Sequence, residues 1–289
     1  ENLYNGLIEK NIDVINYNTS RFDHLRLYNP DKKRNYLRIF NPLNFVFILA
    51  LFVDYFYFVL RIIFKRNLIV HIHTSSFFGW WRSIIYAILS KLLRKKTIFH
   101  VHNAIDRFYV KESGVFGKLL IRTSLKIPDS IISLSHGIKT LLAEITKKPI
   151  KPIYNGIDIN QFAPTKKYIK PYKILFAGFV GPQKGVPDLI KALKKTMLDS
   201  NYIHLTVMGV GDLSDMKDLV NSLEIGNMVT FTGRVSEREK TKLFNSHHIF
   251  ALPSYGEGQP ISILEGMASQ MAIISTNVGS IPEIIKEEN

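Results

Sequence analysis

The sequence contains no cysteine, which excludes disulfides, thiol nucleophiles and metal sites built on thiolates. It also lacks HExxH and DxD patterns, so we expect no bound metal ion and no metal cofactor. No apolar run is long enough to cross a bilayer comfortably. The strongest, FVFILALFVDYFYFVL at 45–60, is short and carries Asp54 near its middle. We expect a helix that is buried or lies in a membrane interface.

Acidic residues are few compared with basic ones: 24 Asp and Glu against 38 Lys and Arg give a formal net charge of +14. Such a charge favours nucleic acid, an anionic membrane surface or phosphate-bearing ligands as partners. Nucleic acid is the weakest of these, because there is neither a zinc-ligand set nor an aromatic-basic motif typical of RNA-binding sheets. Basic residues around the run at 45–60 would suit lipid headgroups, or would equally suit a solvated helix edge.

Short β-branched runs alternate with stretches of helical period along the whole chain, which is typical of βαβ units. We therefore predict an α/β protein with two Rossmann-like parallel-sheet domains that face each other across a cleft. A lysine-rich linker containing Pro164 and Pro171 separates the halves, and we place the boundary near Lys166. The predicted domains are residues 1–165 and 166–289. The strands expected in them lie at 12–18, 68–74, 97–103, 130–135, 151–155, 172–178, 202–209, 228–233, 248–254 and 272–277.

Two carboxylates flank the predicted start of a helix in SYGEGQPISILEG. Glu257 comes before the helix and Glu265 lies inside it, where its side chain leans back toward the N-terminus. The first turn, Gly258 to Ser262, could bind a phosphate through its amides while the carboxylates accept from hydroxyls. A ligand with both sugar hydroxyls and phosphate fits this pattern. The spacing alone is equally consistent with Glu257 as a helix cap and Glu265 as a solvated residue.

Two further loops follow predicted strands. GFVGPQKGV carries Lys184, which is either a diphosphate contact or an exposed lysine in a tight turn. HVHN places His102 at the end of a strand, where it either enters a site or is a satisfied core histidine. We assign His71 and His73 of the earlier HIH run to the core.

Eight motifs in order along the chain resemble family-4 retaining glycosyltransferases of the GT-B fold, especially those that build bacterial surface polysaccharides. They are VHIHTSSFFGWWR, TIFHVHNAIDRFY, YNGIDINQF, FAGFVGPQKGV, MGVGD, VTFTGRV, LPSYGEGQPISILEGMA and STNVGSIPE. The resemblance implies transfer of a sugar from a nucleotide-diphosphate sugar, without a metal ion, to a lipid-linked saccharide or glycan in capsule, O-antigen, lipopolysaccharide or exopolysaccharide synthesis. It also implies a cytoplasmic enzyme, peripheral at the inner face of the plasma membrane.

The resemblance also implies roles for individual residues. Glu265 would hold the ribose hydroxyls, while Glu257 and His102 would contact the donor sugar as the catalytic pair. The remaining donor-binding residues would be Lys184, Gly233, Arg234, Val235, Gly258, Gln259, Pro260, Ile261 and Ser262. Two departures matter: Phe179 stands where the family often has a second cation, and both domains look incomplete, without the first strand and Gly-rich loop and without the C-terminal part. The alternatives are a non-catalytic GT-B-like module that binds polyanions, or another GT-B enzyme such as an epimerase or inverting transferase.

Overall fold

The structure is a computed structural model, and it describes residues 7, 10, 12–15, 17, 42–75, 78–102, 105–111, 113–164, 170–196 and 203–285. The chain divides into two compact units. One contains Glu1–Val70 and Ile85–Thr97, and the other contains His71–Ile84 and Ile98–Asn289. The predicted boundary near Lys166 lies outside the described residues, and the division into domains at 165/166 stays a prediction.

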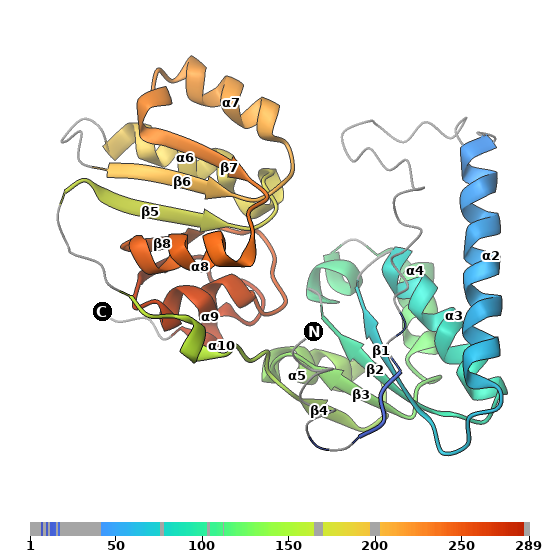
Figure 1. The fold of residues 1–289 in the computed structure, drawn as a ribbon. Helices are drawn as coiled ribbons and strands as arrows, with labels where there is room; N and C mark the ends of the chain where they lie inside the picture. The colour runs from blue at the N-terminus through green and yellow to red at the C-terminus, as the bar shows by residue number, and fades with distance from the viewer. Residues whose placement is uncertain are drawn as a thin grey trace. The chain divides into compact units, whose positions relative to one another are not determined.

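The first sheet has four strands in the order β1-β2-β3-β4 (Figure 1). Their bounds are β1 Ile69–Thr74, β2 Lys96–Val101, β3 Ser130–Ser133 and β4 Ile150–Pro152. The pairings of β2 with β3 and of β3 with β4 are parallel. The connections contain α3 Phe78–Leu92, the π-helix η3 Asp106–Lys111, α4 Val115–Ser124 and α5 His136–Ile145. Chain order equals strand order, so each connection crosses to a neighbouring strand, as in βαβ units.

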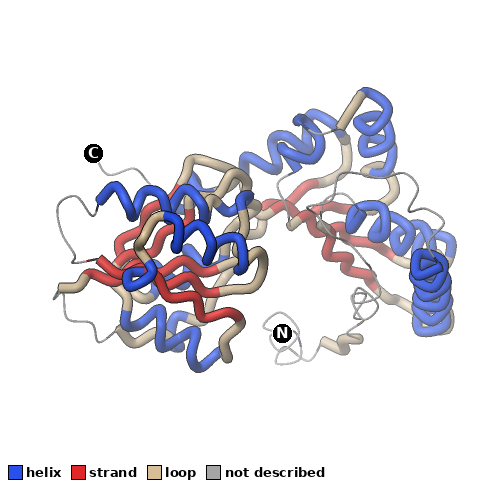
Figure 2. The backbone as a smooth tube through the Cα atoms, turned by 90° about the horizontal axis from the view of Figure 1, so that it is seen from above, coloured by secondary structure: helices blue, strands red, loops and turns tan. Residues whose placement is uncertain are grey.

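The second sheet has five parallel strands in the order β7-β6-β5-β8-β9. They are β5 Tyr172–Ala177, β6 Ile203–Met208, β7 Val229–Gly233, β8 Ile249–Leu252 and β9 Ala272–Ser275. The helices are α6 Val186–Thr196, α7 Leu213–Ser222, α8 Glu237–Ser246, α9 Ile261–Ala268 and α10 Ile281–Ile284, with 3-10 turns η4 Ile159–Gln161, η5 Pro182–Lys184 and η6 Gly226–Met228. Figure 2 shows these strands between helices on both faces. The strand order reverses direction at β5, and such a point in an open parallel sheet is where ligands bind.

The core of the second sheet explains why these runs form buried strands. Phe176, Leu205, Val207 and Phe250 are fully buried, and helices contribute further apolar residues to the same cluster. In α6, Val186, Ile190 and Leu193 face the core, as their spacing at three and four residues predicts. Burial on both faces is the usual state of a parallel sheet covered by helices.

Helix α2, Pro42–Ile62, corresponds to the apolar run and belongs to the first compact unit. Asp54, Phe58 and Ile62 recur every four residues on its buried face, whereas Phe52 and Phe56 are exposed. Asp54 is fully buried, and it accepts hydrogen bonds from the hydroxyl groups of Tyr17 and Tyr86. Among the described residues, no helix is long and apolar enough to cross a membrane.

Nine of the ten predicted strands are confirmed, to within three residues at each end. The exception is the strand expected at 12–18: of these residues 12–15 and 17 are described, and none of them is in a strand. The apolar alternation there is real, but strand structure requires a paired neighbour.

Candidate functional site

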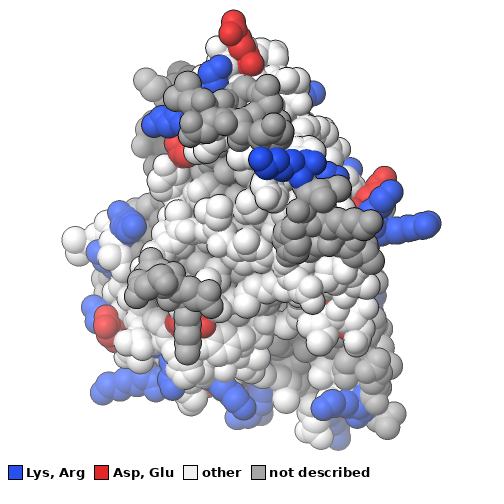
Figure 3. All heavy atoms as spheres, turned by 90° about the vertical axis from the view of Figure 1, so that its left-hand side faces the viewer, with Lys and Arg blue, Asp and Glu red and all other residues white. Residues whose placement is uncertain are grey.

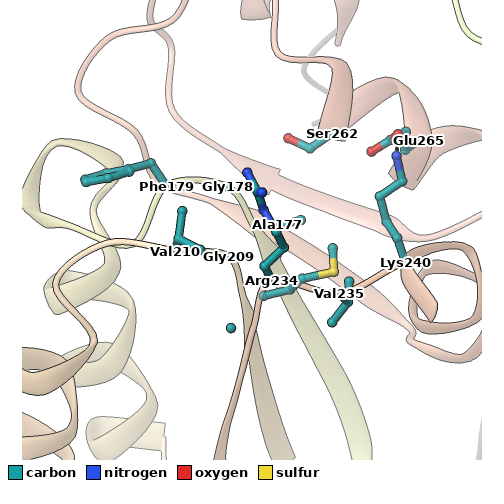
Figure 4. Close-up of a pocket in the computed structure, with 12 residues that line it drawn as sticks. Ala177, Gly178, Phe179, Gly209, Val210, Arg234, Val235, Lys240, Ser262 and Glu265 are labelled. Carbon is teal, nitrogen blue, oxygen red and sulfur yellow. Dashed lines mark ion pairs between the residues drawn. The ribbon is translucent and has the colours of Figure 1, made fainter. Parts of the chain in front are cut away.

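A pocket of about 400 Å³ opens at the carboxyl ends of β5, β6 and β7, beside the first turn of α9 (Figure 4). Five of the predicted donor-binding residues line it together: Gly233, Arg234, Val235, Ser262 and Glu265. Phe179, Val210 and Lys240 also lie in its wall. The pocket is therefore where a parallel sheet is expected to bind a ligand.

Glycines let the loops after β5 and β6 approach each other at the floor of the pocket. Gly209 has φ +143, and a Cβ built on it would lie 1.7 Å from the carbonyl oxygen of Gly178. The amide of Gly178 in turn donates to the carbonyl of Met208 at 3.0 Å. A side chain at position 209 would push these loops apart, so the shape of the pocket depends on this glycine.

Glu265 lies in α9, and only 8% of its surface is exposed. Its Oε1 is 2.9 Å from Nζ of Lys240, the ion pair drawn in Figure 4. Burial raises the pKa of the Glu265 carboxyl, while the hydrogen bond and charge of Lys240 act in the opposite direction. The result is a carboxylate held in an enclosed wall of the pocket, able to accept hydrogen bonds from hydroxyl groups.

Lys240 was not among the residues expected from the sequence, and it belongs to this site. It comes from α8, and its Nζ also lies 2.6 Å from Glu237 Oε2. Burial alone would lower the pKa of Lys240, but the hydrogen bonds and charges of Glu237 and Glu265 raise it. Ser236 and Glu239 form a capping box that starts α8 directly after β7, which places Lys240 one turn into the helix. The capping pattern Ser236 to Glu239 after GRV was the sequence signal that could have placed Lys240 near the pocket.

Phe179 and Arg234 both line this pocket (Figure 4). Half of the Phe179 surface is exposed, so an aromatic ring lies in the pocket at the position where the family often has a second cation. Arg234 follows β7, and its side chain reaches toward the middle of the pocket. The positive charge in the pocket therefore comes from Arg234 and Lys240.

Lys184 and Glu257 contact each other, although we expected each of them to contact ligand. Nζ of Lys184, in η5, lies 2.5 Å from Oε1 of Glu257, whose surface is only 8% exposed. Neither residue is in the wall of the pocket described above. Each retains further donor or acceptor capacity, because a carboxylate has two oxygens and an ammonium has three protons.

The other predicted residues surround the start of α9. Gly258, Gln259 and Pro260 are buried, and Pro260 is the N-cap residue of the helix. Ile261, the first residue of the helix, is 48% exposed. None of these four lies in the wall of the pocket, so of the predicted first turn only Ser262 is brought there.

His102 directly follows β2 and lies among three other histidines, His71, His73 and His100. The assignment of His71 and His73 to the core is wrong: His71 is half-buried and His73 is exposed, whereas Ile72 between them is buried. Alternation along the strand turns the two rings away from the core. Burial lowers the pKa of His102 to about 4 and that of His100 to about 3, so both rings are neutral at pH 7.

The net charge does not gather into one patch on the face shown in Figure 3. Lys and Arg side chains are spread over it among uncharged residues, with some Asp and Glu. On that face, the described residues therefore form no basic stripe of the kind that follows a nucleic-acid backbone.

Family models match the whole chain in two parts. Residues 1–161 match "Glycosyltransferase Family 4", and residues 158–289 match "Glycosyl transferases group 1". An uncharacterized glycosyltransferase of Methanocaldococcus jannaschii is 33% identical over 175 residues, which are 55% of this chain and 45% of that protein. The O-antigen chain mannosyltransferase RfbU of Salmonella typhimurium is 30% identical over 201 residues, 67% of this chain and 55% of the relative. The chain thus spans about half the length of these curated relatives.

Solved structures agree on the fold. The Anabaena protein HepE in complex with UDP and glucose has a TM-score of 0.66 at 16% identity, and the match covers 99% of this chain and 73% of that one. The lipopolysaccharide outer core galactosyltransferase WaaB, in its apo form, has a TM-score of 0.58 at 20% identity, with 86% and 66% covered. Because residues 1–161 match the model of that family, this chain belongs to glycosyltransferase family 4.

Proposed function

We propose that the chain is a retaining glycosyltransferase that transfers a sugar from a nucleotide-diphosphate sugar to a lipid-linked saccharide or glycan. The observation that carries this proposal is the pocket at the ends of β5, β6 and β7, where buried Glu265 lies beside Lys240 and Arg234. A nucleoside diphosphate is a matching ligand, since its ribose offers hydroxyl donors to the carboxylate and its overall negative charge suits a pocket that contains two cations.

In this proposal the predicted donor-binding residues contact different parts of the donor, and Lys240 holds Glu265 in place. Glu265 accepts from the ribose hydroxyls, and Gly233, Arg234 and Val235 lie along the base. Lys184 and the first turn of α9 bind the diphosphate through charge and helix amides. A structure of HepE was solved with UDP and glucose, which supports a nucleotide sugar as the class of donor.

The proposed reaction keeps the configuration at the anomeric carbon and does not need a metal ion. Glu257 and His102 contact the donor sugar. Lys184 and the amides of the first turn of α9 stabilise the departing diphosphate. The acceptor hydroxyl attacks on the face that the diphosphate leaves, and that diphosphate takes up the hydroxyl proton. RfbU is named as an O-antigen mannosyltransferase and WaaB as a lipopolysaccharide galactosyltransferase. These names support a role in a bacterial surface polysaccharide.

The proposed acceptor is carried by a lipid, and we propose that α2 binds the inner face of the plasma membrane from the cytoplasm. Phe52 and Phe56 are 67% and 64% exposed on the side opposite to Asp54 and Phe58. Basic residues follow at the end of the helix and just beyond: Arg61, Lys65 and Arg66. An apolar stripe that ends in cations is the pattern of a helix lying in an anionic interface.

The donor proposal is tested by thermal denaturation of the 289-residue chain with a panel of nucleotide sugars and nucleoside diphosphates. We expect one nucleotide series to raise the melting temperature in a concentration-dependent way. Incubation of that donor with lipid-linked saccharides should give a product whose anomeric configuration, read by NMR, equals that of the donor. An inverted product would refute the retaining mechanism, and failure of every nucleotide to bind would refute the donor site.

The membrane proposal is tested by flotation with vesicles. Wild-type protein should float with vesicles that contain anionic lipid and remain behind with zwitterionic ones. The variant Phe52→Ser/Phe56→Ser should lose flotation, while Ile274→Ser, which changes a similarly exposed apolar residue of β9, should keep it. Equal flotation of both variants would refute a role for α2.

A second function, that of a module that binds polyanions without catalysis, is favoured by one observation. Phe179 places an aromatic ring in the pocket where a cation would contact the diphosphate. The two functions differ in a simple way, because a binding module would release no sugar and form no product from any donor.

A further inference from the structure

Four histidines form a compact group on β1 and β2, within the second compact unit of the chain. The amide of His102 donates to the carbonyl of Thr74 at 3.1 Å, so the ends of the two strands lie side by side. Alternation then places His71 and His73 of β1 on the same face as His100 of β2 and His102, which directly follows it. The sequence pattern HIH with HVH thus becomes a cluster of four imidazoles only when the two strands pair.

The rings are close enough for their nitrogens to share one ion. Nε2 of His71 lies 3.2 Å from Nδ1 of His100. One ring nitrogen from each of His71, His73 and His100 can be chosen so that all three lie within 4.8 Å of one another. In a tetrahedral zinc site with Zn–N bonds of about 2.0–2.1 Å, ligand nitrogens are about 3.4 Å apart. Nε2 of His71 and Nδ1 of His100 already have about that spacing, and a nitrogen of His73 lies within the same 4.8 Å group.

We propose that His71, His73 and His100 bind one divalent transition-metal ion of the zinc class. This site goes beyond the proposed sugar transfer, which uses no metal. The ligand set consists of imidazoles, because the described part of the chain places no carboxylate in the group. Imidazole favours Zn²⁺, Co²⁺, Ni²⁺ and Cu²⁺ over Mg²⁺ and Ca²⁺, which prefer oxygen ligands.

His100 supplies a second, independent observation. Only 8% of its surface is exposed, and its Nε2 is buried without a hydrogen-bond partner among the residues that the structure describes. Buried polar atoms normally have partners, and an unpaired ring nitrogen in a group of imidazoles is typical of a metal ligand. The ring therefore has two candidate ligand atoms: Nδ1, which lies near Nε2 of His71, and the unpaired Nε2, to which a bound ion would give a partner.

His73 and His102 complete the arrangement. His73 is exposed, so it provides a route by which an ion can enter from solvent. Its Nδ1 lies 2.7 Å from Nε2 of His102, and ligation through the other nitrogen of His73 keeps this bond. Metal-bound histidines usually have such an outer partner, which orients the ring. We therefore assign His102 a positioning role beside the metal.

The test uses the tag-free 289-residue chain, titrated with Co²⁺ and then with Zn²⁺. We expect one equivalent of Co²⁺ to give the intense visible bands of a tetrahedral complex, and Zn²⁺ to displace it. Competition with a chelating dye gives the zinc affinity, and Mg²⁺ should not compete. Three variants remove one ligand each: His71→Ala, His73→Ala and His100→Ala. His136→Ala removes an exposed histidine outside the group and is the matched control for His73.

Each ligand variant should bind zinc at least about tenfold more weakly than wild type and lose the tetrahedral spectrum, because even outer partners of a zinc ligand contribute that much. The control His136→Ala should bind as wild type does. If buried His100→Ala fails to fold by circular dichroism, exposed His73→Ala still decides the question. Zinc affinity that is absent in wild type, or unchanged in His71→Ala and His73→Ala, would overturn the proposal. Nucleotide binding is measured separately, so failure of the donor site would not be mistaken for failure of this one.

Discussion

Replacement of Glu265 by alanine tests the donor pocket most directly. The side chain is buried in α9 and lines the pocket, and Lys240 contacts its Oε1 at 2.9 Å. We therefore expect Oε2 to accept a hydrogen bond from the ribose of a bound nucleotide. The variant removes this acceptor but leaves Lys240 paired with Glu237 at 2.6 Å, so the fold should keep most of its stability.

The magnitude follows from the kind of hydrogen bond that is lost. A hydrogen bond to a charged group contributes about 1.5–3 kcal/mol, and each 1.4 kcal/mol is tenfold in affinity. The dissociation constant of the nucleoside diphosphate should therefore rise roughly 10- to 150-fold. Glu265→Gln keeps a neutral acceptor and should fall between wild type and alanine, because neutral hydrogen bonds are about half as strong.

The assay is isothermal titration calorimetry with a nucleoside diphosphate and its 2′-deoxy and 3′-deoxy analogues. In wild type, one deoxy analogue should bind more weakly than the ribose form. In Glu265→Ala that difference should vanish, since protein and ligand have lost the same interaction. Glu144→Gln, an exposed carboxylate of α5, is the control and should bind normally. If Glu265→Ala weakened the binding of the ribose and deoxy ligands equally, Glu265 would not be the partner of the ribose hydroxyl, and the reasoning would be refuted.

Three further predictions concern the pocket and the stability of the fold. Phe179→Arg adds a cation at a half-exposed position of the pocket. Calorimetry should show that the variant binds a nucleoside diphosphate about two- to fivefold more tightly at low salt, with a smaller gain at high salt. Weaker binding by the variant would contradict this prediction. Gly209→Ala forces a Cβ to 1.7 Å from the Gly178 carbonyl and should lower the melting temperature by roughly 5 °C or more, whereas Gly114→Ala, with nothing within 4 Å, should change it little. Burial lowers the pKa of His247 to about 4. Since the unfolded chain binds that proton near pH 6.5 and the folded chain does not, stability should fall as pH drops from 6.5 toward 4, by up to about 3 kcal/mol from this group. Urea unfolding of His247→Gln should show a smaller loss between about pH 7 and 4.5 than wild type, and equal losses would refute the assignment.

The strands could be predicted because each is a short β-branched run between turn residues. The run at 172–178, for example, matches β5, and its buried residues Leu175 and Phe176 are the reason for its composition. The run at 12–18 has a similar composition and forms no strand at the residues described there. Local composition indicates that a segment is able to form a strand, and a neighbour in space is needed to make it one.

The pocket was partly predictable. Residues next to each other in the sequence, such as Gly233 to Val235, were named through the family resemblance, and they lie in the pocket because they stand at the carboxyl end of a strand. Lys240 was missed because its relation to Glu265 joins two separate helices and depends on how α8 packs beside α9. The pairing of Lys184 with Glu257 was missed for the same reason, since each residue was interpreted with its own loop alone.

The sequence by itself determined the alternation of strands and helices, the presence of a helix after SYGEGQP and the family to which the chain belongs. These properties depend on residue types at short spacing, which local sterics and hydrophobic burial convert into structure. Only the tertiary structure decided which charges share the pocket and that His71 and His73 turn away from the core to meet His100 and His102. Contacts of this kind depend on strand pairing and helix packing between distant segments, and a linear pattern does not contain them.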